Sequence, residues 1–286
     1  METRTCQNCK NSFNIEPDDF SFYEKIGVPA PTFCPECRYQ RRISDRNEWE
    51  LYRRDCSRCN ESMVSIYNPE YQGPVYCTKC WWADDWDRLQ YGAEFDFSRP
   101  FFEQFKELRE RTPKLSIAHP RCINSEYTNQ SQDLKNCYMI FGSDQSEDSM
   151  YGSLYFKGKE CVDCHRVLTS ELLYECLNCV NCSRSAYLED CTECTESYFL
   201  KDCKGCTSCF GCVNLRNKSY CWFNEELSKE EYKRRFSEFI FTRPNIAKTE
   251  MKQRELSLIL PKKYYQGQKI INSTGSYIDN IKNCKN

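Results

Sequence analysis

Eight cysteines near the start of the chain form four Cys-x-x-Cys pairs, a spacing that binds metal ions through thiolates. The pairs are Cys6/Cys9, Cys34/Cys37, Cys56/Cys59 and Cys77/Cys80. Zinc takes four thiolates in a tetrahedron, and two pairs supply them. Intervals of 24 residues between the first two pairs and 17 between the last two suit one ion each and fit zinc-ribbon or treble-clef proportions. We therefore predict about two structural zinc ions. The spacing also allows the first pair to join the third, and the second to join the fourth.

A second set of cysteines, more closely spaced, occupies the second half of the chain. Its densest runs are Cys176, Cys179 and Cys182, then Cys203, Cys206, Cys209 and Cys212. Thiols that recur in a repeat can stack as small buried side chains, bind additional zinc, or hold an iron–sulfur cluster. The last run approaches the ferredoxin pattern, but its final step is short and no proline follows it. The sequence leaves these three alternatives open.

The abundance of cysteine, 23 in 286 residues, fits either disulfides or metal thiolates, and these belong to different cellular compartments. The first residues, Met1 to Cys6, are polar and lack the apolar segment of a signal peptide. The cysteine count is odd, and no stretch approaches the ~18–20 apolar residues of a membrane span. We therefore expect a cytoplasmic protein with free or metal-bound thiols and no membrane association.

Arginine and aromatic residues gather after the second cysteine pair. Seven arginines, Arg46 included, face four acidic residues between positions 38 and 58. Guanidinium groups bind phosphates, and aromatic rings stack on bases. The candidate contacts to nucleic acid are Arg38, Arg41, Arg42, Arg53 and Arg54. The net charge of −2 does not favour that partner, and arginines also balance the charge of metal thiolates.

Tyrosines and cysteines recur at a regular interval between residues 121 and 224. Tyr127, Tyr151, Tyr174, Tyr198 and Tyr220 are separated by 24, 23, 24 and 22 residues. A period of this length is typical of a solenoid, in which each coil buries its apolar face on the next. Alternation of apolar with polar residues favours strands over helices. We predict an all-β, β-helix-like solenoid of about four or five coils. The alternative is a series of small metal knuckles without a solenoid.

The segments that border the repeat predict helices. Residues 99–111 carry Phe101, Phe105 and Leu108 on one face, as in a helix that packs between domains. Ser228 and Glu231 form a capping box for a helix over residues 225–243, which we expect to cap the open end of the repeat. A second helix is expected over residues 248–258, before a proline.

These elements define the predicted domain organisation. The parts are a first zinc ribbon (1–47), a second zinc ribbon (48–98), a connecting helix (99–120), the cysteine- and tyrosine-rich β-solenoid (121–224), and a capping helix with a tail (225–286). The tail, Ser276 to Cys284, resembles the start of another coil. We therefore expect longer relatives to continue the repeat.

Several longer phrases of the chain together resemble one known family. They are Phe33–Arg42, Leu51–Cys56, Trp81–Trp86, Phe95–Phe105, Ser125–Asn129 and Cys209–Lys218. As a block they are similar to a family of cysteine-rich zinc-ribbon proteins from uncultured small-genome bacteria, over residues 1 to about 243. The resemblance implies N-terminal zinc-binding modules joined to a cysteine-rich repeat, and it implies no activity. Some members lack thiols at the second site, whereas this chain has all four.

Patterns typical of catalysis are not found in the sequence. The chain has two histidines, no phosphate-binding loop, no dinucleotide fingerprint and no nucleophile elbow. We expect a non-enzymatic zinc-binding scaffold that recognises a macromolecule, with protein favoured over nucleic acid. One alternative is a nucleic-acid-binding protein that acts through the arginines. Another is a redox or iron–sulfur protein that uses the Cys176–Cys212 run. The oligomeric state stays open.

Overall fold

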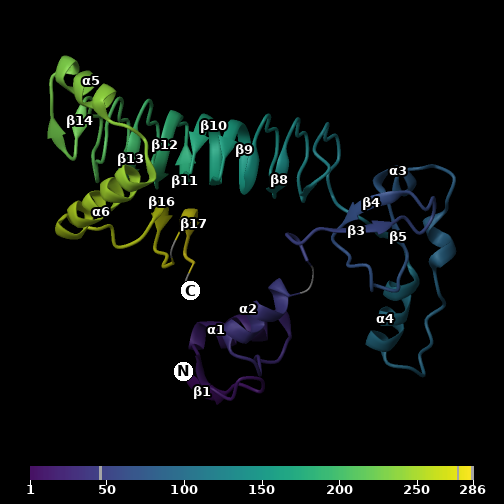
Figure 1. The fold of residues 1–286 in the computed structure, drawn as a ribbon. Helices are drawn as coiled ribbons and strands as arrows, with labels where there is room; N and C mark the ends of the chain where they lie inside the picture. Colours follow the sequence, from purple (N-terminus) through teal and green to yellow (C-terminus); the bar gives the residue numbers. More distant parts are fainter. Residues whose placement is uncertain (45–46, 276, 285–286) are drawn as a thin grey trace. The chain divides into compact units, whose positions relative to one another are not determined.

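The structure is a computed structural model that describes residues 1–44, 47–275 and 277–284 (Figure 1). The chain divides into two compact units, Met1–Ser116 and Ile117–Asn286. The first unit carries the four early cysteine pairs, and the second carries the repeat and the C-terminal helices. Each unit is described by itself.

The first unit contains two modules in which a β-hairpin precedes a helix. In the first module β1 (Glu2–Thr5) pairs antiparallel with β2 (Ser12–Ile15), and α1 (Pro17–Ile26) and α2 (Pro35–Ile43) follow. In the second, β3 (Tyr52–Asp55) pairs antiparallel with β4 (Ser62–Ser65), and β5 (Val75–Tyr76) leads into α3 (Thr78–Trp81). The later cysteine pair of each module therefore begins a helix, where the predicted zinc ribbon would place a second hairpin.

The helix after these modules is more exposed than its apolar stripe predicts. α4 (Phe101–Arg111) follows a 3₁₀ turn at Arg88–Tyr91, and β6 (Lys114–Leu115) then pairs parallel with β5. None of the α4 residues, all of which are described, is buried. Phe101 and Phe105, the aromatic residues of that stripe, are 55% and 49% exposed. The core of the second module closes around Val75 and Tyr76 without them.

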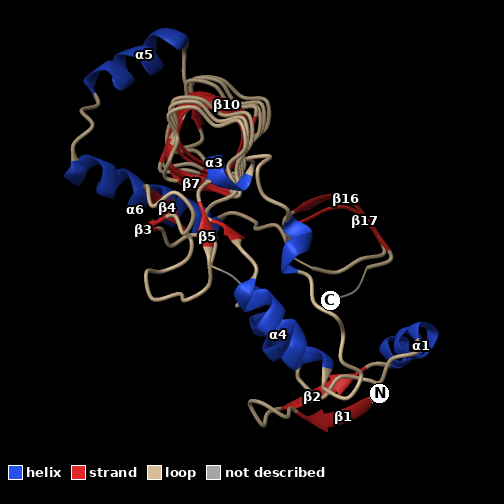
Figure 2. Cartoon of the chain, turned by 90° about the vertical axis from the view of Figure 1, so that its right-hand side faces the viewer, coloured by secondary structure: helices blue, strands red, loops and turns tan. Residues whose placement is uncertain are grey.

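Seven parallel strands form the main sheet of the second unit, in the order β13-β12-β11-β10-β9-β8-β7. The strands are β7 (Thr128–Asn129), β8 (Tyr138–Phe141), β9 (Met150–Val162), β10 (His165–Tyr174), β11 (Leu177–Val180), β12 (Ser183–Glu189) and β13 (Tyr198–Lys201). Residues twelve positions apart pair, as in Tyr138 with Met150 and Tyr198 with Phe210. Each twelve-residue turn of the chain, here called a coil, thus stacks on the one before it. In Figure 2 the coils superimpose.

The coil is half as long as the tyrosine spacing predicts. Pairing from Ile123 with Lys135 to Phe210 with Trp222 keeps the twelve-residue register. Tyr127 and Tyr151 are separated by two coils, because the intervening coil carries a methionine at the same position. The predicted period near 24 and the count of four or five coils are therefore wrong, and about twice as many coils fill the interval.

Every third residue of the repeat, from Gln130 to Phe223, has a positive φ between 47° and 68°. The left-handed conformation costs an L-residue roughly 1–2 kcal/mol, and Asn, Asp and Gly tolerate it best. Many of these positions are Asn or Asp. Hydrogen bonds between coils offset the cost, as where the N–H of Asp148 donates to the carbonyl oxygen of Lys135 at 2.9 Å. Three-residue steps between turns make the coil four-sided.

The residue two positions before each turn points into the coil and builds its core. These inward residues are mainly cysteine, leucine, valine and serine, and most are almost fully buried. Serines link successive coils, since the Oγ of Ser125 accepts the N–H of Cys137 at 3.0 Å and the Oγ of Ser197 accepts that of Cys209 at 3.2 Å. The interior is therefore filled by small side chains at every third position.

Two helices follow the last coil. β14 (Cys221–Trp222) pairs antiparallel with β15 (Glu225–Glu226), and α5 (Lys229–Glu238) and α6 (Arg243–Ile259) come next, with α5 beside the end of the repeat (Figure 1). The Oγ of Ser228 caps α5 by accepting the N–H of Glu231 at 3.1 Å, as the capping box predicts. α6 begins earlier than expected because the Oγ of Thr242 caps it, with a proline in its first turn.

The tail repeats the geometry of a coil on a small scale. β16 (Gly267–Ile271) pairs parallel with β17 (Ile278–Lys282) in a register of eleven residues, as in Gly267 with Ile278. Lys269, Asn272, Asn280 and Asn283 have positive φ. The segment that resembles a coil in sequence, Ser276 to Cys284, thus has its local geometry, although Ser276 itself lies outside the described residues.

Candidate metal centres

Four thiols from two elements converge in the first module. Cys6 and Cys9 lie in the β1–β2 loop, Cys34 is the N-cap of α2, and Cys37 lies in the first turn of that helix. Their sulfur atoms lie within 4.8 Å of one another, and the Sγ atoms of Cys9 and Cys34 are 3.8 Å apart. A tetrahedral zinc ion with bonds of about 2.3 Å would separate its sulfur ligands by roughly 3.8 Å. The cluster can hold one metal ion.

The second module repeats this arrangement with Cys56, Cys59, Cys77 and Cys80. Their sulfur atoms also lie within 4.8 Å of one another, with 3.9 Å between those of Cys59 and Cys77. One left-handed residue closes the hairpin loop in each module, Lys10 at φ 65° and Asn60 at φ 60°. The structure therefore joins the first pair to the second and the third to the fourth, and the interleaved alternative is wrong.

Backbone N–H groups prepare one buried sulfur in each cluster for ionisation. The N–H of Cys34 donates to the Sγ of Cys6 at 3.3 Å, and that of Cys77 donates to the Sγ of Cys56 at 3.2 Å. Burial opposes ionisation of the thiols, but backbone donors outweigh it and lower the pKa of Cys6 to about 6 and that of Cys56 to about 7. The thiolate is the form that binds metal. These two sulfurs are therefore preorganised as ligands.

Arginine and tryptophan side chains support the second cluster. Arg58 donates from Nη1 to the carbonyl oxygen of Cys80 at 3.2 Å. The rings of Trp81 and Trp86 lie 5.4 Å apart, and the guanidinium of Arg88 lies over them at 5.3 and 5.5 Å. Cation–π contacts of this kind stabilise small modules that have little apolar core.

The cysteines of the Cys176–Cys212 run line the interior of the coils. The thiols of Cys176, Cys179, Cys182, Cys203, Cys206, Cys209 and Cys212 each donate to the carbonyl oxygen two residues earlier, at 3.3–3.5 Å. Burial raises the pKa of Cys161, which lies in the same interior, to about 12. In the described part of the chain, the compact thiol clusters suited to a metal are the two in the first unit. These hydrogen bonds are those of thiols packed in the interior of the coils.

Six further cysteines share this interior and were not among the candidates that the sequence suggested. They are Cys137, Cys161, Cys164, Cys191, Cys194 and Cys221, each at most 4% exposed. Their distances along the chain from Cys176 are all multiples of three. That three-residue spacing is the signal that could have identified them.

The arginines proposed as nucleic-acid contacts lie on two elements. Arg38, Arg41 and Arg42 belong to α2, whereas Arg53 and Arg54 belong to β3. Arg41 lies over the ring of Phe33 at 4.9 Å, and Arg54 donates to the carbonyl oxygen of Asn68 at 3.0 Å. Arg46 lies outside the described residues. Part of this group therefore has a structural role within its own module.

Comparisons with known proteins do not assign the chain to a family. In the described ranges, no helix is both long enough and apolar enough to cross a membrane. No protein-family model matches the chain, and no curated protein is similar to it at a significant level.

Proposed function

We propose that this chain is a non-enzymatic zinc-binding scaffold that recognises another protein. Each four-cysteine cluster would hold one zinc ion, because four thiolates in a tetrahedron suit zinc and leave no position for a substrate. The stacked coils would form a β-solenoid, an architecture that presents extended binding surfaces. The many reduced thiols suit a cytoplasmic protein.

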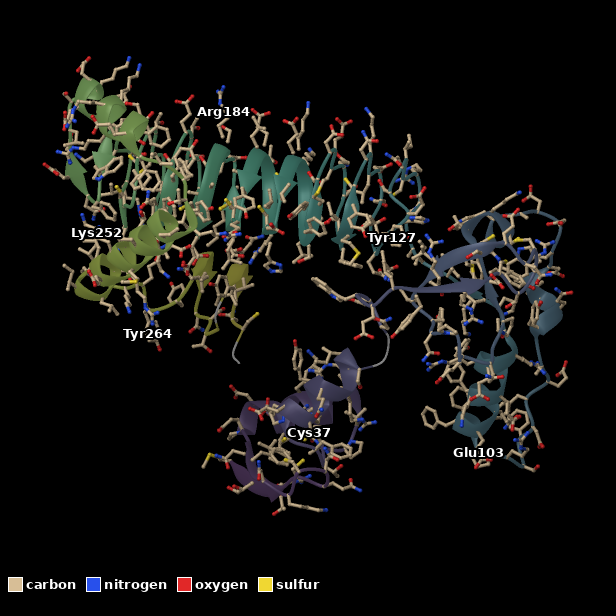
Figure 3. All side chains as sticks on the ribbon, viewed as in Figure 1. Cys37, Glu103, Tyr127, Arg184, Lys252 and Tyr264 are labelled. Atoms are coloured by element: carbon tan, nitrogen blue, oxygen red, sulfur yellow. The ribbon has the colours of Figure 1, made fainter. Side chains whose placement is uncertain are left out.

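A group of exposed phenylalanines carries the proposal of a protein partner. This phenylalanine surface consists of Phe95, Phe97, Phe101, Phe102 and Phe105, whose side chains are 44%, 93%, 55%, 80% and 49% exposed. It lies on and before α4, the helix on which Glu103 is labelled in Figure 3. Soluble proteins rarely expose neighbouring apolar groups of this size unless a partner covers them. Aromatic side chains are also enriched at the centres of protein interfaces.

Polar contacts hold the phenylalanine surface in one arrangement. The N–H of Asp96 donates to the Oε1 of Gln104 at 2.8 Å, and the Nε2 of Gln104 donates back to the carbonyl oxygen of Asp96 at 2.9 Å. Arg99 forms an ion pair with Glu107 on α4. The rings of Phe101 and Phe105 stack at 5.7 Å. Such preorganisation lowers the entropy lost when a partner binds.

Replacing Phe97 and Phe102 together with serine is expected to abolish capture of the partner. The purified chain would be used as bait in extracts of its own organism, and recovered proteins would be quantified by mass spectrometry. We expect the partner to fall by at least about tenfold with the double variant, because buried aromatic anchors carry most of the binding free energy. Leu89→Ser is the matched control, since Leu89 is 84% exposed in the same unit but lies outside the surface. Equal recovery with all three baits would contradict the proposal.

The nucleic-acid alternative predicts a different result. It requires binding that weakens steeply with salt and disappears when Arg41, Arg42, Arg53 and Arg54 become alanine. We expect Arg42→Ala with Arg53→Ala, which leaves the structural contacts of Arg41 and Arg54 in place, to change recovery of the partner by less than about twofold, since exposed charges away from an interface contribute little. Salt-sensitive binding of single-stranded RNA that the quadruple variant loses would instead assign the chain to nucleic acid.

A further inference from the structure

One outer face of the repeat is lined by aromatic residues, one or two in most coils. Strand pairing at twelve-residue intervals places Tyr138, Met150, Val162, Tyr174, Ala186, Tyr198, Phe210 and Trp222 in one row. Beside it runs a row that includes Tyr127, Tyr151, Asp163, Glu175, Tyr187, Phe199 and Phe223. Ring centroids along this aromatic face are 4.1 to 5.7 Å apart, from Tyr127–Tyr138 at 5.4 Å to Phe210–Trp222 at 4.1 Å.

The C-terminal half of the aromatic face is covered by the chain's own helices. Tyr232 and Phe236 stack on each other across one turn of α5 at 6.0 Å. Phe236 contacts Tyr198 at 5.0 Å, and Tyr232 contacts Trp222 at 6.1 Å. Phe239, after the helix, reaches Phe210 at 4.8 Å. An amphipathic helix with aromatic residues four apart is therefore the structure that this face accepts.

The N-terminal half of the same face is not covered in this way. Tyr138, Met150 and Tyr151 are 43%, 36% and 50% exposed, whereas Phe199 and Phe210 under the helices are at most 1% exposed. Figure 3 labels Tyr127 in the first coils and Lys252 on α6 towards the other end of the repeat. The two halves lie in the same rows and are separated by one coil without a ring, which carries Val162 and Asp163 at these positions. An exposed apolar surface that continues an existing interface is a natural binding site.

The size and charge of the uncovered half define its occupant. The ring centroids of Tyr127 and Tyr138 are 5.4 Å apart, and those of Tyr138 and Tyr151 are 5.7 Å apart. Together they match the rise of about two helical turns, roughly 11 Å at 1.5 Å per residue. Glu126 and Asp163, both exposed, border these rings. A helix that docks here would therefore carry aromatic residues one turn apart and basic residues on its flanks.

We propose that the uncovered half of the aromatic face, centred on Tyr138 and Tyr151, docks a basic amphipathic helix of a partner protein, seated as α5 is on the covered half. This inference rests on the proposed function and adds a second contact surface to the phenylalanine surface of the first unit.

The test uses the full chain and a peptide that copies its own covering helix. The probe is a fluorescein-labelled peptide of residues 229–243, which has five basic and three acidic residues, and binding is measured by anisotropy. Tyr138→Ser with Tyr151→Ser is expected to raise its Kd at least about tenfold. Tyr264→Ser is the matched control, because Tyr264 is 98% exposed and lies outside the face, and it should leave Kd within about twofold.

A second variant does not remove any ring and guards against loss of folding. Asp163→Asn keeps a residue that tolerates the φ of 54° at this position and removes only a charge. It should weaken binding of the basic peptide roughly threefold and reduce its salt dependence. A peptide with Tyr232→Ser and Phe236→Ser should not bind.

Each other outcome overturns the inference in an identifiable way. Equal binding to the wild type and to the Tyr138/Tyr151 variant would place the peptide on the covered half, in exchange with α5. No binding to the wild type would remove the surface, while capture through Phe97 and Phe102 would still support the scaffold proposal. A dimer in sedimentation that dissociates on substitution of Tyr138 and Tyr151 would show that a second copy of the chain, and not another protein, covers the face.

Discussion

Replacing Cys56 with serine is expected to lower the zinc content of the purified chain from about two ions to about one and to unfold the second module. A structural zinc ion contributes about 10–16 kcal/mol of binding free energy, most of which is folding free energy in a small module. The buried core around this cluster is small, with Met63, Val75 and Tyr76 as its main apolar members. Plasma mass spectrometry on anaerobically purified protein gives the metal count. Protease sensitivity confined to residues 47–116 reports the unfolding.

Two other cysteines provide matched controls for the metal count. Cys284 is exposed in the tail, and Cys206 is fully buried inside the coils. Cys284→Ser and Cys206→Ser should both retain about two zinc ions, since four thiolates saturate each tetrahedral site. A count well above two, or iron with visible absorption that Cys206→Ser removes, would instead move the metal chemistry into the repeat.

Substituting Gly152 with alanine is expected to unfold the repeat, with a loss of more than about 3 kcal/mol in the free energy of unfolding. Tyr155 is fully buried in the narrow interior, and its Oη accepts the N–H of Cys164 at 2.8 Å. A methyl group on Gly152 would lie 2.1 Å from that Oη and 2.3 Å from the carbonyl oxygen of Cys164. Because one of these atoms belongs to the backbone, a change of side-chain rotamer cannot relieve the clash.

The chain offers a control on the other side of the same tyrosine. Gly158 is also an inward residue, but a methyl group there would meet the Cβ of Tyr155 and the Oγ of Ser146 at 3.5 Å, which is ordinary contact. Gly158→Ala should therefore change stability by less than about 1 kcal/mol. The midpoint of urea denaturation, followed by circular dichroism, compares the variants. Equal midpoints for both alanine variants would show that Tyr155 can leave the interior.

The two thiol clusters of the first unit follow closely from the sequence. A Cys-x-x-Cys turn needs only a few consecutive residues, such as Cys6 to Lys10 with its left-handed φ of 65°. Its hydrogen bonds are local, so short-range spacing is sufficient to predict it. The cap of α5 at Ser228 was predictable for the same reason, because it depends on Ser228 and Glu231 alone.

In the repeat, the same three-residue spacing of cysteines arises from the coil and not from a metal-binding turn. The local sequence does not distinguish the two structures. Cys176, Cys179 and Cys182 are three residues apart because each side of the coil contributes one inward residue. Their thiols donate to carbonyl oxygens of the coil, and they do not belong to either of the compact thiol clusters that could hold a metal ion. Only the stacking of coils at a twelve-residue interval determines where these thiols point, since the strand pairing joins residues of successive coils.

The sequence by itself therefore determined the chemistry of the ligands, the grouping of thiols into local pairs and the cap of α5. The tertiary structure decided the length of the coil, the burial of the inner thiols, and the exposure of Phe101 and Phe105. The physical reason is the range of the interactions. Turns and caps are fixed by neighbours within a few residues, whereas register and burial depend on contacts between whole coils and helices.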